Sequence, residues 1–214
     1  MMKNSNATRT RLLDAARDVI RAQGYAASTV DDICAAAGVS KGSFFHHYAS
    51  KDELAVAAIA AFDEMATALF TTAPYTKLAD PRERILAYVD FRIALLQGDI
   101  VQYTCLLGTT TQEVHATHPA LREACDAAMT GHVEMLARDL AAAKRKYAPR
   151  AAWTPESVGY FMQSVLQGAF IFAKAKQSPE VAIGCVQHLR RYLESILTPG
   201  PGRPRTVKTK ETKR

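Results

Sequence analysis

Apolar residues recur along most of the chain at the three- and four-residue spacing that places them on one face of a helix. One such stripe runs through Leu54, Ala58, Phe62, Met65 and Leu69. The sequence contains no alternating apolar and polar runs bounded by Asn-Gly or Asp-Gly, the pattern that would indicate β-hairpins. The pattern therefore predicts an all-α protein.

Proline positions predict where several of these helices begin. A proline follows a residue that can cap a helix at four places: Asp80-Pro81, Thr154-Pro155, Ser178-Pro179 and, as a weaker case, His118-Pro119. Proline suits the first helical position because its φ angle is preset and its missing N–H would have no partner there. Periodicity and these starts predict about nine helices, near residues 8–23, 29–37, 41–47, 51–71, 81–97, 100–115, 119–146, 155–176 and 179–197.

The most informative pattern lies between residues 28 and 51. Thr29 can cap one short helix, Gly38 suits the left-handed turn that ends it, and Ser40 can cap a second helix that starts at Lys41. Two short helices joined in this way form a helix-turn-helix, whose second helix can enter the major groove of DNA. Residues 38–51 contain no acidic side chain that would repel phosphate.

This part of the chain resembles the TetR (tetracycline repressor) family of bacterial transcriptional regulators. The resemblance runs from Arg11 to about Phe62 and rests on matched positions at fixed spacing: Gly24-Tyr25, Thr29 to Ile33, Ala36 to Ser43, Phe44 to Tyr48 and Ser50 to Leu54. It implies an N-terminal three-helix DNA-binding domain followed by a helical domain that binds an effector and dimerises.

The resemblance also implies which residues meet DNA. Ser43 and His47 would face base edges, and Gly42 would allow a close backbone approach. Phosphates would be held by Thr29, Ser40, Lys41, His46 and Lys51. Phe45 stands where the family commonly has a phosphate-binding tyrosine, and a phenylalanine cannot donate that hydrogen bond. Tyr48 closes the segment and also suits the core.

Residues 51–199 resemble the C-terminal domain of one TetR subgroup more weakly. The matched stretches are Cys105 to Gly108, Gln112-Glu113 and His118 to Arg122. They imply an effector pocket among the middle helices. The side chains that we expect to line it are Phe91, Leu95, Tyr103, Cys105, Thr109, Gln112, His115, Met129, Trp153, Tyr160 and Phe170. A mostly apolar cavity with a few polar groups is the usual form of such a site.

The last two predicted helices carry more apolar surface than one helical face of a monomer buries. Two such hairpins can close a four-helix bundle about a two-fold axis, which predicts a homodimer. The candidate interface residues are Phe161, Val165, Gly168, Phe172, Val181, Cys185, Leu189 and Tyr192. The alternative is that all of them belong to the core of one chain.

The distribution of charge sharpens this interpretation. The 214-residue chain has a net charge of +6, and residues 200–214 supply most of it with six basic and one acidic side chain. We expect residues 1–7 to be frayed, 8–50 to form the DNA-binding domain, 51–198 the effector and dimerisation domain, and 199–214 a disordered basic tail that adds salt-sensitive DNA affinity.

The function predicted from these features is a ligand-responsive repressor that binds a palindromic DNA operator and is released by a small molecule. An alternative is a sensor of electrophiles or oxidants that reacts through Cys105, although a buried, inert thiol explains that residue equally. A helical adaptor or an enzyme without DNA binding is the alternative from another class.

Other classes find less support in the sequence. We expect no membrane-spanning helix, because charges should interrupt every window long enough to span a membrane. The N-terminus lacks a secretion signal, so a cytoplasmic, nucleoid-associated protein with reduced cysteines is expected. No cofactor motif is found. A metal cluster of His115, His118 and either Cys125 or His132 is disfavoured because Pro119 starts a new helix between them.

Overall fold

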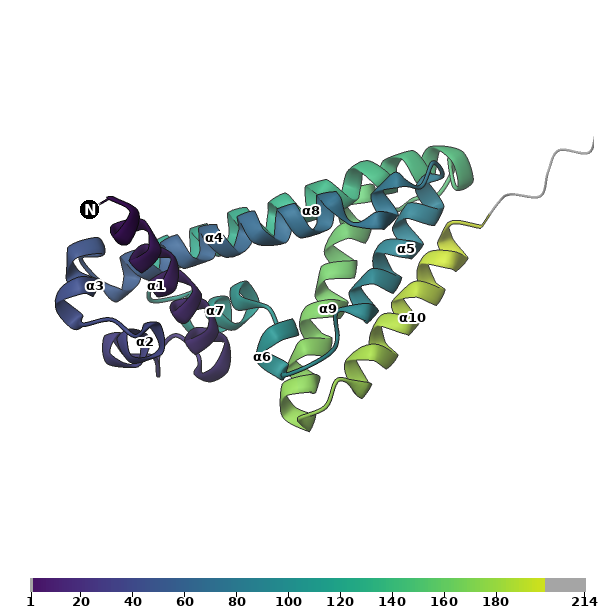
Figure 1. The fold of residues 1–214 in the computed structure, drawn as a ribbon. Helices are drawn as coiled ribbons and strands as arrows, with labels where there is room; N and C mark the ends of the chain where they lie inside the picture. Colours follow the sequence, from purple (N-terminus) through teal and green to yellow (C-terminus); the bar gives the residue numbers. More distant parts are fainter. Residues whose placement is uncertain (1, 199–214) are drawn as a thin grey trace, which may run out of the picture.

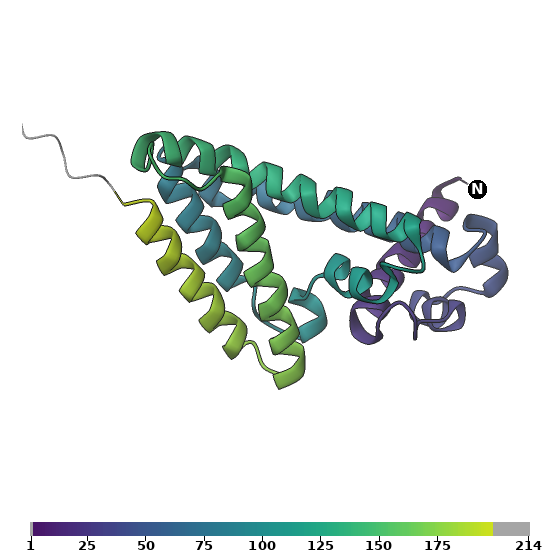
Figure 2. The same cartoon turned by 180° about the vertical axis from the view of Figure 1, so that it is seen from behind.

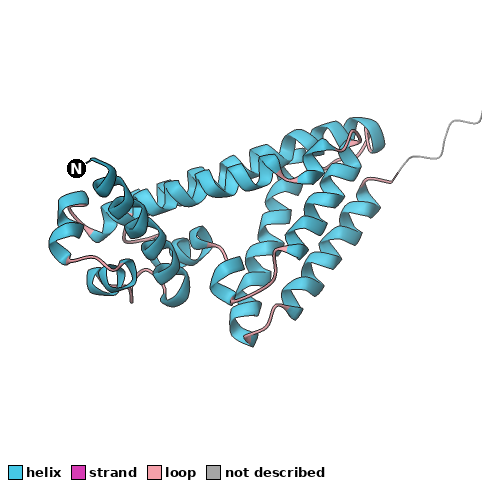
Figure 3. Cartoon of the chain, viewed as in Figure 1, coloured by secondary structure: helices cyan, strands magenta, loops and turns pink. Residues whose placement is uncertain are grey.

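The computed structural model describes residues 2–198, with side chains from residue 6 onward. Every element in this range is helical, as Figure 3 shows, and the predicted all-α class is confirmed. The first helix starts earlier than predicted: α1 spans Met2–Gln23, whereas the predicted helix spans residues 8–23. Residues 2–7, expected to fray, contain neither proline nor glycine, so nothing in the sequence stops the helix from extending through them. Residue 1 and the predicted tail at 199–214 lie outside the described range.

Three helices form a compact group at one end of the molecule (Figure 1). α1 is followed by α2 (Val30–Ala37) and α3 (Lys41–His47), and α2 and α3 both pack against α1. α4 (Lys51–Thr72) then leads away from this group as a long rod. The helix-turn-helix predicted from the sequence is therefore present.

The remaining helices form the larger part of the molecule. A 3₁₀ turn (Pro74–Lys77) precedes α5 (Pro81–Ala94), and two short helices follow, α6 (Ile100–Tyr103) and α7 (Leu106–Val114). The last three helices are long: α8 (Pro119–Tyr147), α9 (Pro155–Lys176) and α10 (Glu180–Ile196). Both faces of the molecule show α4 and α8 running side by side from the small group to the bundle of α5, α9 and α10 (Figures 1 and 2).

One predicted helix is divided in two. The segment 100–115 was expected to be continuous, but Thr104 and Cys105 have extended backbone angles that separate α6 from α7. Neither proline nor glycine marks this break. The sequence could not reveal it, because the packing of α7 against α1 and α8, and not local propensity, determines where the chain turns.

Two apolar cores share the long helices α4 and α8. The N-terminal core contains Leu54 and Ile59 of α4 and Leu121 of α8, so it extends well beyond residue 50. The larger core contains Phe70 from the far end of α4 and Leu140 from the far end of α8. By length and composition α4 could cross a membrane, contrary to the prediction that charges interrupt every such window. In this fold, α4 packs against α1 and α8 and connects the two cores.

Candidate functional site: a helix-turn-helix surface and an interior cavity

The caps predicted from the sequence hold α2 and α3 in place. The Thr29 side chain accepts a hydrogen bond from the Asp32 N–H (3.1 Å), and the Asp32 carboxylate accepts one from the Thr29 N–H (2.9 Å). Gly38 ends α2 with a φ angle of +61°, a left-handed conformation that costs glycine little. The Ser40 hydroxyl then accepts from the Ser43 N–H and caps α3. These contacts fix the angle between the two helices.

The first turn and the outer face of α3 are open to solvent. Phe45 is 57% exposed, Lys41, Gly42 and His46 are exposed, and the His47 ring is half-buried beside His46. The Lys41 ammonium forms an ion pair with Asp31 of α2 at 2.8 Å, but both side chains are well exposed. Such a surface pair is weak, so phosphate can replace Asp31 at little cost.

Two residues predicted to meet DNA have structural roles in this conformation. The Lys51 ammonium donates to the backbone carbonyls of Tyr25 (3.0 Å) and Ser28 (2.9 Å) and lies 4.0 Å from the centre of the Tyr25 ring. It therefore fastens the turn after α1 to the start of α4. Tyr48 is buried beside Phe44, as the alternative in the sequence interpretation allowed.

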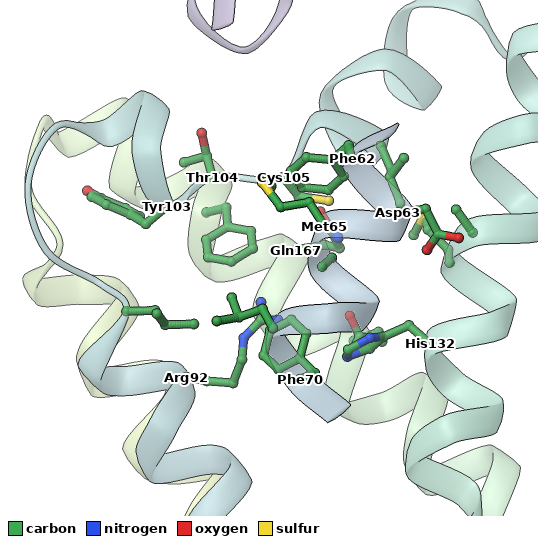
Figure 4. A pocket seen from close by; sticks show the side chains of 18 of the residues that line it. Phe62, Asp63, Met65, Phe70, Arg92, Tyr103, Thr104, Cys105, His132 and Gln167 are labelled. Atoms are coloured by element: carbon green, nitrogen blue, oxygen red, sulfur yellow. The ribbon is translucent and has the colours of Figure 1, made fainter. Parts of the chain in front are cut away.

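An interior cavity of about 180 Å³ lies between the two cores, and it is partly open to solvent beside the exposed side chains of Met65 and Leu69. It is bounded by residues from α1, α4, α5, α6, α7, α8 and α9, and most of its walls are apolar (Figure 4). The principal lining residues are Arg21, Phe62, Asp63, Met65, Leu69, Phe70, Arg92, Leu95, Tyr103, Thr104, Cys105, Leu107, Met129, His132, Gln163, Gln167 and Phe170.

The cavity contains polar groups that burial keeps out of water. Arg21 is only 6% exposed, and its Nε atom has no hydrogen-bond partner among the described residues. Figure 4 shows Arg92 and His132 approaching the Phe70 ring from opposite sides. Burial, followed by repulsion from Arg92, lowers the pKa of His132 to about 3, so this ring is neutral at pH 7 and pairs with the Tyr88 hydroxyl at 2.9 Å. Burial also raises the pKa of Asp63.

Comparison with known proteins identifies this arrangement. Residues 12–58 match the family described as bacterial regulatory proteins, tetR family, and residues 81–189 match the tetracyclin repressor-like C-terminal domain. The second match covers about half of the chain. The chain belongs to the TetR family. The predicted family and the general class of function, transcriptional regulation, are thereby confirmed.

Individual TetR-family relatives resemble different parts of the chain. The HTH-type transcriptional regulator UidR of Escherichia coli is 36% identical over 70 residues, which are 33% of this chain and 36% of UidR, so the match spans about a third of that relative. The HTH-type transcriptional repressor NemR of E. coli is 23% identical over 190 residues, or 87% of this chain and 94% of NemR. A TetR transcriptional regulator from Chloroflexus aurantiacus has the same fold, with a TM-score of 0.79 at 22% identity over 89% of this chain and 96% of the other.

In the structure, some of the residues expected to line the pocket lie on the cavity wall and others lie elsewhere. Five of them line the cavity: Leu95, Tyr103, Cys105, Met129 and Phe170. Thr109 and Gln112 line a neighbouring cavity together with Cys105 and Lys174. The other four expected residues lie outside both cavities. Phe91 packs against Phe70 and Tyr75, and the Trp153 ring lies under the Lys144 ammonium. His115 and Tyr160 are exposed.

The sequence interpretation missed both cavity arginines. Arginine on a helix usually belongs to the solvated face, so neither Arg21 nor Arg92 was predicted to line the pocket. A signal was nevertheless present for Arg92, which follows Tyr88 by four residues and Val89 by three and therefore shares their buried face. Arg21 directly follows the buried Ile20 and offered no comparable signal.

The outer side of α9 and α10 carries several exposed apolar side chains. Phe172 is 55% exposed, and Phe161 and Tyr192 lie in edge-to-face contact on the surface, with ring centres 4.9 Å apart. Gly168 and Gly184 have open space above them. Most of the predicted interface residues share this surface, but Leu189 is 2% exposed in the core of the chain, because its helical position faces α9 and α5.

Proposed function

We propose that this TetR-family protein is a repressor that binds a palindromic DNA operator as a homodimer and leaves it when a small molecule occupies the interior cavity. The observation that carries the proposal is that one domain presents a solvent-exposed helix-turn-helix, while α1 of that same domain contributes Arg21 to the wall of the cavity. DNA and ligand would therefore act on a shared element. Such a regulator would work in the cytoplasm, at the nucleoid.

The exposed apolar surface of α9 and α10 supports the dimer. Exposed aromatic residues on adjacent helices are typical of a surface that a partner covers. A two-fold axis through this surface would present two copies of α3, and two reading helices about 34–36 Å apart fit half-sites on one face of DNA. The dimer is thus the assembly that α3 needs in order to read a palindrome.

Ligand release requires the ligand to prefer one arrangement of the DNA-binding domain over another. Two polar contacts hold α1 and its following turn against the effector domain. The Ala26 N–H donates to the Glu113 carboxylate of α7 at 2.7 Å, and the Lys174 ammonium of α9 donates to the Arg21 carbonyl at 3.3 Å. A ligand that alters the cavity wall would shift these contacts and, with them, the spacing of the two α3 helices.

The double substitution Lys41→Ala, His47→Ala tests the DNA surface. DNA sites are first selected from a random library with the wild-type protein, and binding is then measured by fluorescence anisotropy. We expect the variant to bind the selected site about tenfold to 100-fold more weakly, because it loses one phosphate contact and one base contact. The matched control Lys77→Ala, His115→Ala removes the same residue types from other exposed positions. Unchanged binding by an intact Lys41, His47 variant would contradict the site.

Thiol sensing through Cys105 is a second candidate. Cys105 is half-buried at the start of α7 and borders both cavities, and Arg21 and Lys174 lie close enough to interact with it electrostatically. If this candidate is correct, N-ethylmaleimide will release DNA from the wild type and from Cys185→Ser, whose thiol is equally half-buried, but not from Cys105→Ser.

A further inference from the structure

Two arginines face this mostly apolar cavity, and neither has a carboxylate partner in the described part of the chain. Among the described residues, neither Arg21 nor Arg92 forms an ion pair within 4 Å. Arg92 lies over the faces of Phe70 and Phe170, with its guanidinium carbon 5.0 and 5.8 Å from the ring centres. Arg21 lies 5.7 Å from the Phe62 ring centre, and its buried Nε lacks an acceptor.

This arrangement is costly unless something completes it. A buried guanidinium remains protonated at neutral pH, and an unpaired buried charge is destabilising. Stacking on an aromatic ring satisfies the face of the guanidinium plane but supplies no acceptor for the N–H groups at its edge, and the buried Nε of Arg21 has none among the described residues. A ligand that completes the site would therefore be an anion, and its acceptor atoms would meet the N–H groups at the edge of the guanidinium plane.

The other titratable groups of the cavity do not supply that charge. Asp63 of α4 is the one acidic residue among those that line it, and its carboxylate forms no ion pair with Arg21 or Arg92, so it neutralises neither arginine. His132 of α8 is neutral, and Tyr103 of α6 bears a hydroxyl whose pKa burial raises. Lys174 of α9 adds a further positive charge in the neighbouring cavity.

The size and walls of the cavity define the rest of the ligand. A volume of about 180 Å³ slightly exceeds the roughly 150 Å³ of an apolar protein cavity that admits benzene. The walls offer the rings of Phe62, Phe70 and Phe170 and the side chains of Met65 and Met129. They fit one aromatic ring, or an aliphatic body of that size.

We infer that the effector is a small aromatic or similarly sized organic carboxylate, whose carboxylate is bound by Arg21 and Arg92 while its apolar body fills the space between the phenylalanine rings. A guanidinium presents its N–H groups in a planar fork that matches the two oxygens of a carboxylate. That this ligand acts as an effector rests on the proposed function, whereas its binding to the cavity does not depend on DNA.

The position of Arg21 gives this ligand a direct route to the DNA-binding domain. Arg21 belongs to the last turn of α1, and its carbonyl accepts from Lys174. Gly24, with a φ of +88°, begins the turn that leads to α2. A carboxylate that draws the Arg21 side chain toward Arg92 would therefore shift the last turn of α1 and the turn that connects it to α2.

The test is calorimetric titration of the purified full-length protein, without DNA, with benzoate and cyclohexanecarboxylate and with their neutral isosteres benzamide and cyclohexanecarboxamide. We expect the preferred carboxylate to bind at least about tenfold more tightly than its amide, which corresponds to about 1.4 kcal/mol. Arg21→Gln and, separately, Arg92→Gln should abolish this preference, and Arg21→Lys should restore part of it. Asp63→Asn should tighten carboxylate binding, because it removes the competing negative charge.

Arg17→Gln is the matched control. It removes the same charge from the same helix one turn earlier, where Arg17 is paired with Asp14 and Asp18 outside the cavity, so the preference for carboxylate should persist. Equal binding of acid and amide, absence of binding by every probe, or a preference that survives both arginine substitutions would each overturn the inference. Loss of the proposed function is distinguishable, because it would appear as absence of sequence-selective DNA binding by the wild type while the titrations still show the carboxylate preference.

Discussion

Mild acid should destabilise this protein through His132. The ring lines the cavity, packs edge-on against Phe70 with ring centres 4.9 Å apart, and places Nε2 2.9 Å from the Tyr88 hydroxyl. Burial and the positive charge of Arg92 lower its pKa to about 3 in the folded chain. In the unfolded chain both influences vanish, and the ring titrates near 6.5.

The difference in pKa sets the sign and the size of the effect. Above about pH 6.5 the ring is neutral in both states and contributes no pH dependence. Between 6.5 and about 3 the unfolded chain binds a proton that the folded chain excludes, so the free energy of unfolding falls by about 1.4 kcal/mol per pH unit. At pH 5.0 the loss attributable to His132 is about 2 kcal/mol.

Urea denaturation at pH 7.5 and pH 5.0, at one fixed protein concentration, measures this loss. His132→Gln removes the titration and retains a group that can hydrogen-bond to Tyr88, so the variant should lose about 2 kcal/mol less than the wild type between the two pH values. Any cost of the substitution itself is present at both pH values and cancels. His115→Gln changes an exposed histidine and should follow the wild type. If the wild type and His132→Gln lose the same free energy, burial does not hold His132 neutral and the reasoning fails.

Two further predictions concern the dimer and the glycines. Phe172→Asp should convert the proposed dimer to a monomer in light scattering at micromolar concentrations, because each dimer would bury two charges in an apolar surface. Leu78→Asp, at a leucine that is 41% exposed away from this surface, should remain dimeric. A dimeric Phe172→Asp variant would place the interface on another surface. Gly131→Ala should stabilise the protein by about 0.5–1 kcal/mol in urea denaturation, since an added Cβ meets open space on a helix. Gly159→Ala should destabilise it by about 1–3 kcal/mol, since the added Cβ would lie 3.0 Å from Val133 Cγ1; the reverse order would show that packing between α8 and α9 is loose at this point.

The sequence predicted those parts of the fold that local chemistry determines. Pro81, Pro119 and Pro155 are the first residues of α5, α8 and α9, as proline at the first helical position requires. Gly38 adopts the left-handed conformation that was expected of it. The break at Thr104 and the extension of α1 to Met2 were missed, because neither depends on a residue with a strong local preference.

The candidate pocket was predictable in part, and its charged residues were not predicted. Leu95, Met129 and Phe170 line the cavity, and they could be predicted because large apolar side chains on middle helices usually point inward. Arg21 could not be assigned to the cavity from the sequence, since its burial depends on how α1 meets α7 and α9. The charged groups of a buried site are placed by tertiary contacts, and these are the groups that decide which ligand binds.

The movement of the DNA-binding domain that the proposed function requires does not need the domain to unfold. Its core is continuous with α4 and α8 through Leu54 and Leu121, and apolar packing of this kind tolerates small rotations, because it is not directional. Two hydrogen bonds also hold the domain in place: the Ala26 N–H donates to the Glu113 carboxylate, and the Lys174 ammonium donates to the Arg21 carbonyl. Both lie at the last turn of α1 or directly after it. A ligand that binds Arg21 therefore acts on the contacts that set the tilt of the domain, while the packing that keeps the domain folded stays intact.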